Sequence, residues 1–186
     1  GYDAPTSKNF SYTETNNYSW RDPETSEYTL TYNEDGTVAE VTADNRKYAY
    51  EYEDGKLVKE TYLYYDQWAG VDVSEYIKEF EYDENGNCVT ETKYNAYQNP
   101  PVAQEGVDYF YDLNVEADSV YVFAYPHEVL PTHAYLVTKA VTYYYNQDLE
   151  TGEATKGNFS VKTYNYNEEV VNAPVAPTNL VANVLN

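Results

Sequence analysis

The stretch EYDENGNCVTETKY, residues 81–94, contains the motif that decides the fold. Similar stretches occur earlier, as TYNEDGTVAEVT at 31–42 and as EYEDGKLVKETY at 51–62. In each copy a tyrosine is followed by acidic or amide residues, a glycine and then an apolar pair. Asn, Asp and Gly tolerate the positive φ that the two-residue turns of antiparallel hairpins require, so each copy predicts a β-hairpin. The expected turn glycines are Gly36, Gly55 and Gly86.

The residues on either side of these turns alternate with a period of two, as they do in strands with one buried face. In KYAYEYE, residues 47–53, three tyrosines share one face, and YTLTY (28–32) and YIKEFEY (76–82) alternate in the same way. No segment shows convincing helical spacing. We therefore predict an all-β, antiparallel meander of repeated hairpins, an open twisted or partly curled sheet of about ten strands. The expected strands are 27–33, 37–43, 47–53, 56–64, 75–83, 87–95, 106–112, 119–125, 134–146 and 158–167, with room for one more before residue 27.

The 186 residues favour one domain, which we place at 1–169. Residues 170–186 contain no charge and no aromatic ring, and two prolines interrupt them. This Val- and Pro-rich tail is either a linker or a strand that covers part of the sheet. The single cysteine, Cys88, excludes an internal disulfide. Because it lies at a strand start, we expect it to be buried.

The charge is strongly negative, with 32 acidic residues against 11 basic ones and a formal net charge of −21. Such a surface repels nucleic acid and anionic lipid, which proteins bind through Lys and Arg, so we expect no nucleic-acid partner. No apolar run approaches the roughly 18–20 residues of a membrane span. Acidic chains are often disordered, but 25 tyrosines indicate a folded β-protein here.

Parity of the connections suggests where a ligand would bind. In a simple meander, alternate connections lie at the same end of the sheet, which places the long connections 64–75, 95–106 and 125–134 together. Binding residues concentrate on long loops held by a rigid scaffold, and Tyr and Trp are frequent anchors there. The candidate ligand-binding residues are Tyr64, Tyr65, Trp68 and Tyr97. The alternative for Trp68 is that it folds inward and caps the core.

Metal binding has weak support. HEVLPTH offers His127 and His133, but the zincin motif needs its histidines four apart on a helix, and Pro131 lies between these two. An EF-hand loop needs glycine at its sixth position and glutamate at its twelfth, whereas DENGNCVTETKY has Gly86 fourth and Tyr94 twelfth. Turn formation accounts for these acidic residues, so we predict no metal and no cofactor.

The repeated tyrosine, acidic-Gly turn and apolar pair resemble the YD repeats of Rhs-type wall and toxin proteins. Short repeat-bearing envelope lipoproteins of Gram-negative gut bacteria are similar as well. The match covers 28–64 and 76–94 and is weaker at 109–118 and 163–169, and the repeat spacing is uneven. The resemblance implies a secreted or surface-anchored β-meander and carries over no catalytic residue.

Three functions follow as hypotheses. The first is a non-enzymatic extracellular or periplasmic domain, held to the envelope by a lipid anchor, that binds a glycan or a protein partner through loops at one end of the sheet. The second is a structural or assembly spacer of the envelope. The third is a carboxylate-based glycoside hydrolase, which needs an acid whose pKa is raised by an apolar pocket, and no sequence feature identifies one. We therefore predict no catalytic residues.

Overall fold

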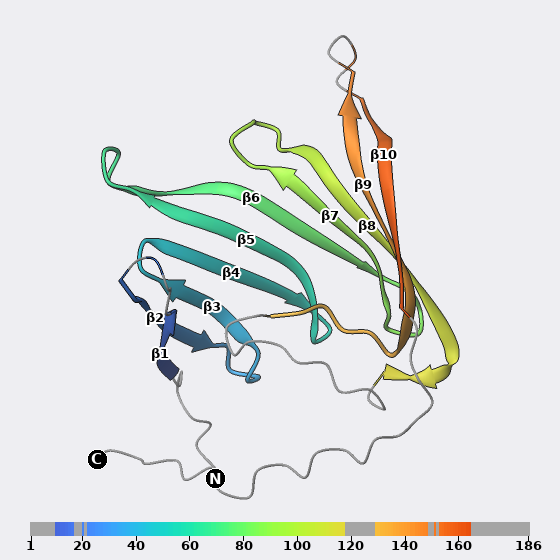
Figure 1. The fold of residues 1–186 in the computed structure, drawn as a ribbon, viewed down its shortest axis with the longest axis horizontal. Helices are drawn as coiled ribbons and strands as arrows, with labels where there is room; N and C mark the ends of the chain where they lie inside the picture. Colours follow the sequence, from blue (N-terminus) through green and yellow to red (C-terminus); the bar gives the residue numbers. More distant parts are fainter. Residues whose placement is uncertain are drawn as a thin grey trace, which may run out of the picture.

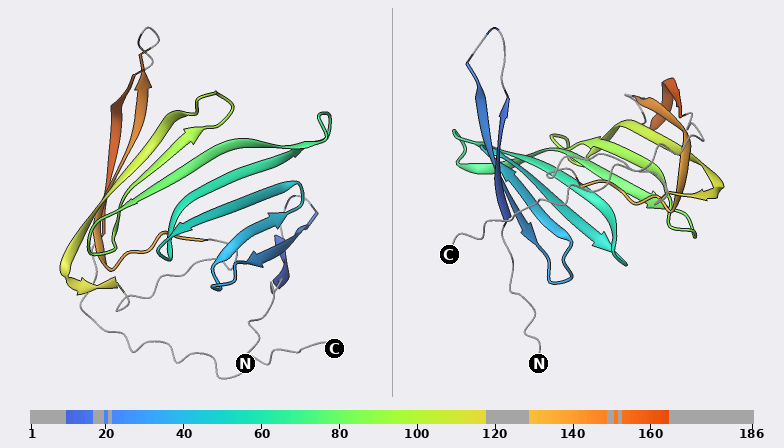
Figure 2. Two further views of the ribbon diagram at one scale, coloured as in Figure 1. Left: turned by 180° about the vertical axis from the view of Figure 1, so that it is seen from behind. Right: turned by 60° about the horizontal axis from the view of Figure 1, so that its bottom comes forward.

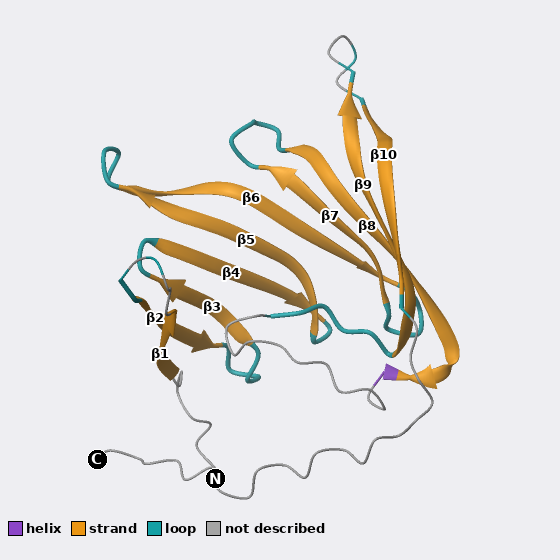
Figure 3. Cartoon of the chain, in the orientation of Figure 1, coloured by secondary structure: helices purple, strands orange, loops and turns teal. Residues whose placement is uncertain are grey.

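The computed structural model describes residues 10–16, 20, 22–117, 129–148, 151 and 153–164. Ten antiparallel strands follow one another in chain order within one sheet, so β1 and β10 form its edges (Figure 1). Among the described residues only Ala117 is helical (Figure 3). The strands are β1 (Phe10–Asn16), β2 (Glu24–Tyr32), β3 (Val38–Ala43), β4 (Arg46–Glu53), β5 (Lys56–Asp66), β6 (Val71–Tyr82), β7 (Cys88–Asn95), β8 (Val102–Glu116), β9 (Tyr135–Gln147) and β10 (Ala154–Thr163).

The predicted all-β meander is confirmed, with two differences in its membership. β1 is the additional strand for which the sequence left room before residue 27. The expected strand at 119–125 lies outside the described residues, as does the tail at 170–186. β8 instead pairs directly with β9. No described helix has the length and apolar character needed to cross a membrane.

The three repeats form hairpins of closely similar register. Gly36, Gly55 and Gly86 have φ values of 89°, 74° and 88°, the left-handed region predicted for them. Of the three repeat turns, Asp54–Gly55 alone has two residues; residues 33–37 and 83–87 form longer connections in which glycine follows two turn residues. The two-residue prediction is therefore wrong for these two copies, because the extra residues are accommodated by a turn followed by one left-handed residue.

The repeated tyrosine explains why the motif recurs. In each copy it pairs with the first or second residue of the next strand, which is Val38, Leu57 or Cys88, and the register shifts beside it. The carbonyl of that partner residue then accepts a hydrogen bond from a tyrosine hydroxyl further along the chain. Successive hairpins are linked in this way. The donor–acceptor pairs are Tyr52 to Val38 (3.0 Å), Tyr82 to Leu57 (2.8 Å) and Tyr111 to Cys88.

One face of the sheet carries the main core, and we call it the core face. Its buried residues are Leu30, Val41, Tyr50, Leu57, Phe80 and Cys88. Residues 129–134, the strap, run against this face, where Val129 packs on the core and the Cys88 amide donates to the Thr132 carbonyl at 3.1 Å. Figure 2 shows the curl of the sheet and the strap from two further directions. Among the described residues, the strap is the segment that forms a second layer over the sheet.

Asn87 anchors the strap. It is fully buried, its side-chain amide donates to Asp83 at 2.9 Å, and its side-chain oxygen accepts the Tyr135 amide at 2.9 Å. One side chain therefore joins the third repeat turn to the start of β9. The sequence marked this residue only as part of a turn.

Candidate functional site

Three hairpins separate from one another at one end of the sheet, which we call the splayed end (Figure 1). It carries the connections β5–β6 (67–70), β7–β8 (96–101) and β9–β10 (148–153). The insertions predicted at 64–75 and 95–106 are largely extensions of strands, so each ends in a short turn rather than a long loop.

The parity prediction holds for 64–75 and 95–106 and is wrong for 125–134. The described part of that connection, residues 129–134, lies at the opposite end, beside the turn at 83–87. The prediction counted a strand at 119–125 between β8 and β9. Because β8 and β9 are direct neighbours, one strand fewer reverses the parity of everything after it.

The four ring residues proposed from sequence are only partly brought together. The rings of Tyr64 and Tyr97 lie 6.5 Å apart between centroids. Tyr65 follows Tyr64 directly on β5, so it points to the other face of the sheet. Trp68 lies in the β5–β6 turn, and its side chain is 99% exposed. The inward-capping alternative for Trp68 is therefore wrong.

The turn that carries Trp68 is well ordered by hydrogen bonds. The Asp66 carboxylate accepts the backbone amides of Trp68 at 2.8 Å and Ala69 at 3.1 Å. The Gly70 amide donates to the Asp66 carbonyl at 2.7 Å, and Gly70 has a φ of 68°. The backbone that carries the exposed indole is therefore ordered before any ligand binds, so binding costs little further backbone entropy.

A cleft opens between β8 and β9 at the same end. Pairing between these strands stops at Glu105 and Tyr144, although β8 continues to Val102 and β9 to Gln147. Beyond that point β8 pairs only with β7, and β9 pairs only with β10. The resulting cavity has a volume of about 450 Å³, within the range of roughly 300–1,000 Å³ found for ligand sites.

The cleft is lined mainly by polar side chains, together with Val102 and Ala103. Gln98, Gln104 and Gln147 make no side-chain hydrogen bond with any described residue. The same holds for the carboxylate of Glu105, while the phenol of Tyr144 is 58% exposed. Sequence reasoning missed this site, because it results from strands that stop pairing rather than from a motif. The glutamines in YQNPPVAQEG were the available signal.

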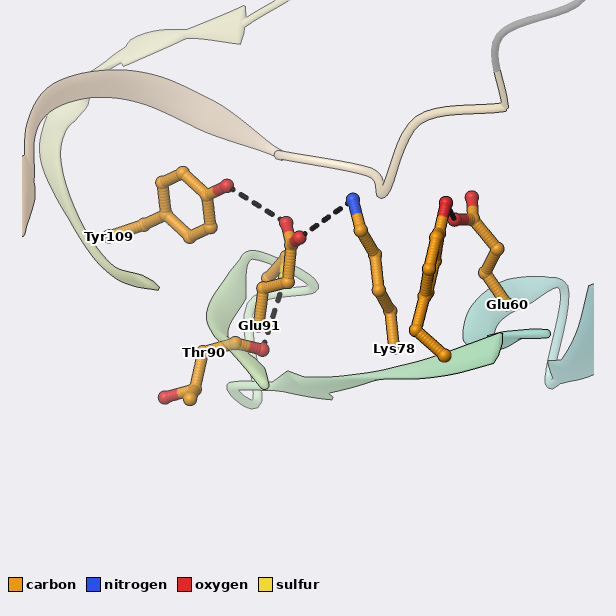
Figure 4. A network of polar contacts seen from close by, with 7 residues as sticks. Glu60, Lys78, Thr90, Glu91 and Tyr109 are labelled. Atoms are coloured by element: carbon orange, nitrogen blue, oxygen red, sulfur yellow. Dashed lines mark hydrogen bonds and ion pairs between the residues drawn. The ribbon is translucent and has the colours of Figure 1, made fainter. Parts of the chain in front are cut away.

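The core face also carries a buried carboxylate, Glu60, and a half-buried ion pair, Lys78–Glu91 (Figure 4). The Tyr76 hydroxyl donates to Glu60 at 3.2 Å, and Glu91 accepts Lys78 at 2.9 Å and the Tyr109 hydroxyl at 3.3 Å. Burial raises the pKa of Glu60. Burial alone would lower the pKa of Lys78, but the adjacent Glu91 outweighs it and the pKa is raised. Each member has a partner, so this network serves packing.

The two histidines do not form a site in the described part of the chain. His127 lies outside the described residues. His133 belongs to the strap, where its Nδ1 lies 2.7 Å from the Tyr111 hydroxyl. That hydroxyl donates its one proton to the Cys88 carbonyl, so it accepts from Nδ1–H and sets the tautomer of His133. No three metal-ligating side chains cluster among the described residues.

Cys88 is buried, as expected. It is 0% exposed, and burial is the main cause that raises the pKa of its thiol to about 12. A thiol in this setting is not ionised at neutral pH and is unsuited to nucleophilic chemistry.

Comparison with known proteins gives structural neighbours of unknown function. No protein-family model and no curated protein matches the chain. One solved structure is a DUF3836 family protein from Bacteroides vulgatus ATCC 8482, with 15% identity, a TM-score of 0.41 and coverage of 64% of this chain and 99% of that chain. Another DUF3836 family protein, from Parabacteroides distasonis ATCC 8503, has 15% identity, a TM-score of 0.40 and coverage of 62% and 87%.

A protein of unknown function from Bacteroides fragilis NCTC 9343 covers 82% of this chain and 92% of its own, with 8% identity and a TM-score of 0.41. Likenesses at this level assign no activity to the chain. No YD-repeat or Rhs family is among them, so that resemblance stays a prediction.

Proposed function

We propose that this protein is a non-enzymatic binding domain whose splayed end recognises a glycan. The observation that carries the proposal is Trp68, a fully exposed indole on a turn ordered by Asp66. An exposed ring of this size is costly to hydrate, and aromatic faces stack on the apolar faces of sugar rings. Tyr97, 59% exposed, offers a second ring at the same end of the sheet.

Binding is favoured over hydrolysis by the composition of the cleft. A glycoside hydrolase places two carboxyl groups on either side of the scissile bond. Among its described lining residues the cleft has one carboxylate, Glu105. The amides around it suit recognition of hydroxyl groups and supply no acid–base pair.

The proposal includes a location outside the cytoplasm, in the envelope or the extracellular space, with a lipid anchor in a longer protein. It is supported by the resemblance of the hairpin repeats to those of surface proteins. Two alternatives remain for the experiment to distinguish from glycan binding. One is a protein partner that binds the same rings, and the other is a structural spacer.

The test is a glycan array followed by calorimetric titration of the strongest ligand. We expect Trp68→Ala to weaken binding about ten- to hundredfold, the usual effect of losing a stacked anchor. Trp20→Ala is the matched control, because Trp20 is also exposed, at 74%, but lies in the β1–β2 connection at the edge of the sheet, with β3 and β4 between it and the β5–β6 hairpin. Equal loss in both variants, or binding to no glycan at all, would overturn the proposal in favour of a protein partner or a spacer. Turnover of a bound polysaccharide would revive the hydrolase.

A further inference from the structure

We propose that the β8–β9 cleft is the main sugar-binding site and that it selects neutral, hydroxyl-rich oligosaccharides. This inference rests on the proposed glycan-binding function and adds its place and its class of ligand. Trp68 and the cleft are separate features of the splayed end, so each can be tested without the other.

The cleft is a stable feature of the fold. Its two walls are the ends of β8 and β9, and each is paired on its outer side. Val102 lies opposite Asn95 of β7, and Gln147 lies opposite Ala154 of β10. The walls of the cleft are therefore in place before a ligand enters, and binding does not require the entropic cost of ordering a loop.

The lining matches hydroxyl groups in particular. Each of Gln98, Gln104 and Gln147 offers two donors and one acceptor that no described side chain or backbone group uses. A sugar hydroxyl both donates and accepts, so adjacent hydroxyls can satisfy both functions of one amide. An apolar ligand would bury these amides without partners, which is unfavourable. The exposed Tyr144 adds a ring against which a sugar can lie.

The net charge of the protein disfavours acidic sugars. Glu105 forms no ion pair with any described residue, and the whole chain has a net charge of −21. Lys93 lines the same cleft and keeps its positive charge in a cation–π contact 4.4 Å from the Tyr76 ring centroid, and the carboxylate of Glu105 offsets that charge within the cleft. A uronic acid or a sulfated sugar would enter a site of unfavourable potential.

An extended peptide fits the cleft less well. β-strand addition needs a free strand edge, and the unpaired edges here are only residues 102–104 and 145–147. At a rise of about 3.3 Å per residue, three residues provide an edge of roughly 10 Å. That is shorter than a typical strand of five to six residues, so main-chain pairing would be brief.

The experiment is a titration of the ¹⁵N-labelled protein followed by NMR of its side-chain amide and indole signals. The probes are neutral gluco- and manno-oligosaccharides of two to six residues, oligogalacturonates of the same lengths, and an uncharged extended peptide. We expect neutral oligosaccharides to shift the side-chain amide signals of the three cleft glutamines. Asn85, an exposed asparagine in the turn at 83–87 at the opposite end of the sheet, is the internal control and should not shift with them.

Variants sharpen the result. Gln104→Ala should weaken neutral oligosaccharide binding about tenfold, whereas Asn85→Ala should leave it unchanged. Glu105→Gln should narrow the difference between neutral and acidic oligosaccharides. All these positions are solvent-accessible or partly so, and circular dichroism confirms folding of each variant.

The outcomes separate the two proposals. If only the Trp68 indole signal shifts and the cleft amide signals do not, glycan binding is supported but the assignment of the sugar site to the cleft is wrong. Shifts of the cleft amides with an unaffected Trp68 variant would support the cleft and overturn Trp68 as the anchor. Equal binding of oligogalacturonate, or cleft shifts with the peptide alone, would overturn the class of ligand. No shift with any sugar would overturn both.

Discussion

At the residue scale, the tyrosines have structural roles that differ by position. The rings of Tyr48, Tyr62 and Tyr76 follow one another across β4, β5 and β6 with centroids 5.0 Å apart. Rings packed against each other have little free face for a ligand. The tyrosines at the repeat positions instead use their hydroxyls, which satisfy carbonyls beside the register shifts. Exposed rings at the splayed end are therefore the minority available for binding.

The hydroxyl links can be tested at Tyr82. Tyr82→Phe removes the hydrogen bond to the Leu57 carbonyl and leaves that partly buried acceptor unpaired. We expect unfolding to become easier by about 1–2 kcal/mol in urea denaturation. Tyr65→Phe is the control, since Tyr65 is 45% exposed and should change stability by less than about 0.5 kcal/mol. Equal effects would contradict a structural role for the hydroxyl link.

The turn glycines provide a second test. Replacing Gly36, Gly55 or Gly86 by Val forces a β-branched residue into positive φ. We expect a loss of about 1–3 kcal/mol for each, visible as a lower melting temperature. No atom other than a flexible lysine side chain lies within 4 Å of an added Cβ at these positions, so the loss would report backbone strain. Unchanged melting temperatures in all three variants would show that the turns do not require glycine.

At the element scale, the strap decides how the core face is closed. Asn87 holds the junction of the strap with β9 by bonding to Tyr135, and His133 holds the strap itself by bonding to Tyr111, so both attachments involve residues distant in sequence. Asn87→Asp would lose the amide donor to Asp83 and set a second carboxylate beside it. We expect a loss of about 3–5 kcal/mol, as for other broken buried polar contacts, measured by urea unfolding. A variant as stable as the parent would show that this anchor is dispensable.

The strap also gives stability a dependence on pH. Burial lowers the pKa of His133 from its ordinary value of 6.5, although the charge of Glu91 acts in the opposite direction. In the unfolded chain this histidine therefore binds a proton at a higher pH than in the folded protein. Its contribution to stability is complete above about pH 6.5 and is lost as the pH falls below that value. Denaturation of the parent and of His133→Gln between pH 5 and 8 checks this.

In that comparison the parent should lose more stability on acidification than His133→Gln. Glu60, whose pKa burial raises, contributes in the opposite sense, because its folded state binds the proton more readily. It is present in both proteins, so the difference between them isolates His133. Parallel pH profiles would contradict the assignment.

At the scale of the whole molecule, the net charge of −21 is not balanced by local pairing. The described ion pairs include Lys47–Asp72 and Lys59–Glu51, at 2.6 and 2.7 Å, and each of these two pairs has one exposed member. Self-repulsion in the folded state should therefore outweigh them. We expect the melting temperature to rise between about 0.02 and 0.5 M sodium chloride, where the screening length falls below about 10 Å. A fall would mean that ion pairs dominate.

The alternation and turns of the repeats determined the strands, their antiparallel order and the left-handed glycines. These features depend on residues that are neighbours in sequence. In a strand whose apolar side chains alternate with polar ones, only one face can be buried. Tyr48, Tyr50 and Tyr52 all pack into or against the core as that pattern predicted. Cys88 was placed correctly for the same reason.

Tertiary structure alone decided the strap, the Asn87 anchor and the cleft. The strap depends on β8 pairing directly with β9, a choice between distant segments that no local pattern contains, and one strand fewer moved 129–134 to the other end of the sheet. The cleft depends on where that pairing stops. Strand propensity favours pairing along the whole length of both strands. In the fold, however, three hairpins diverge as the sheet curls, and mainly polar side chains line the gap between β8 and β9.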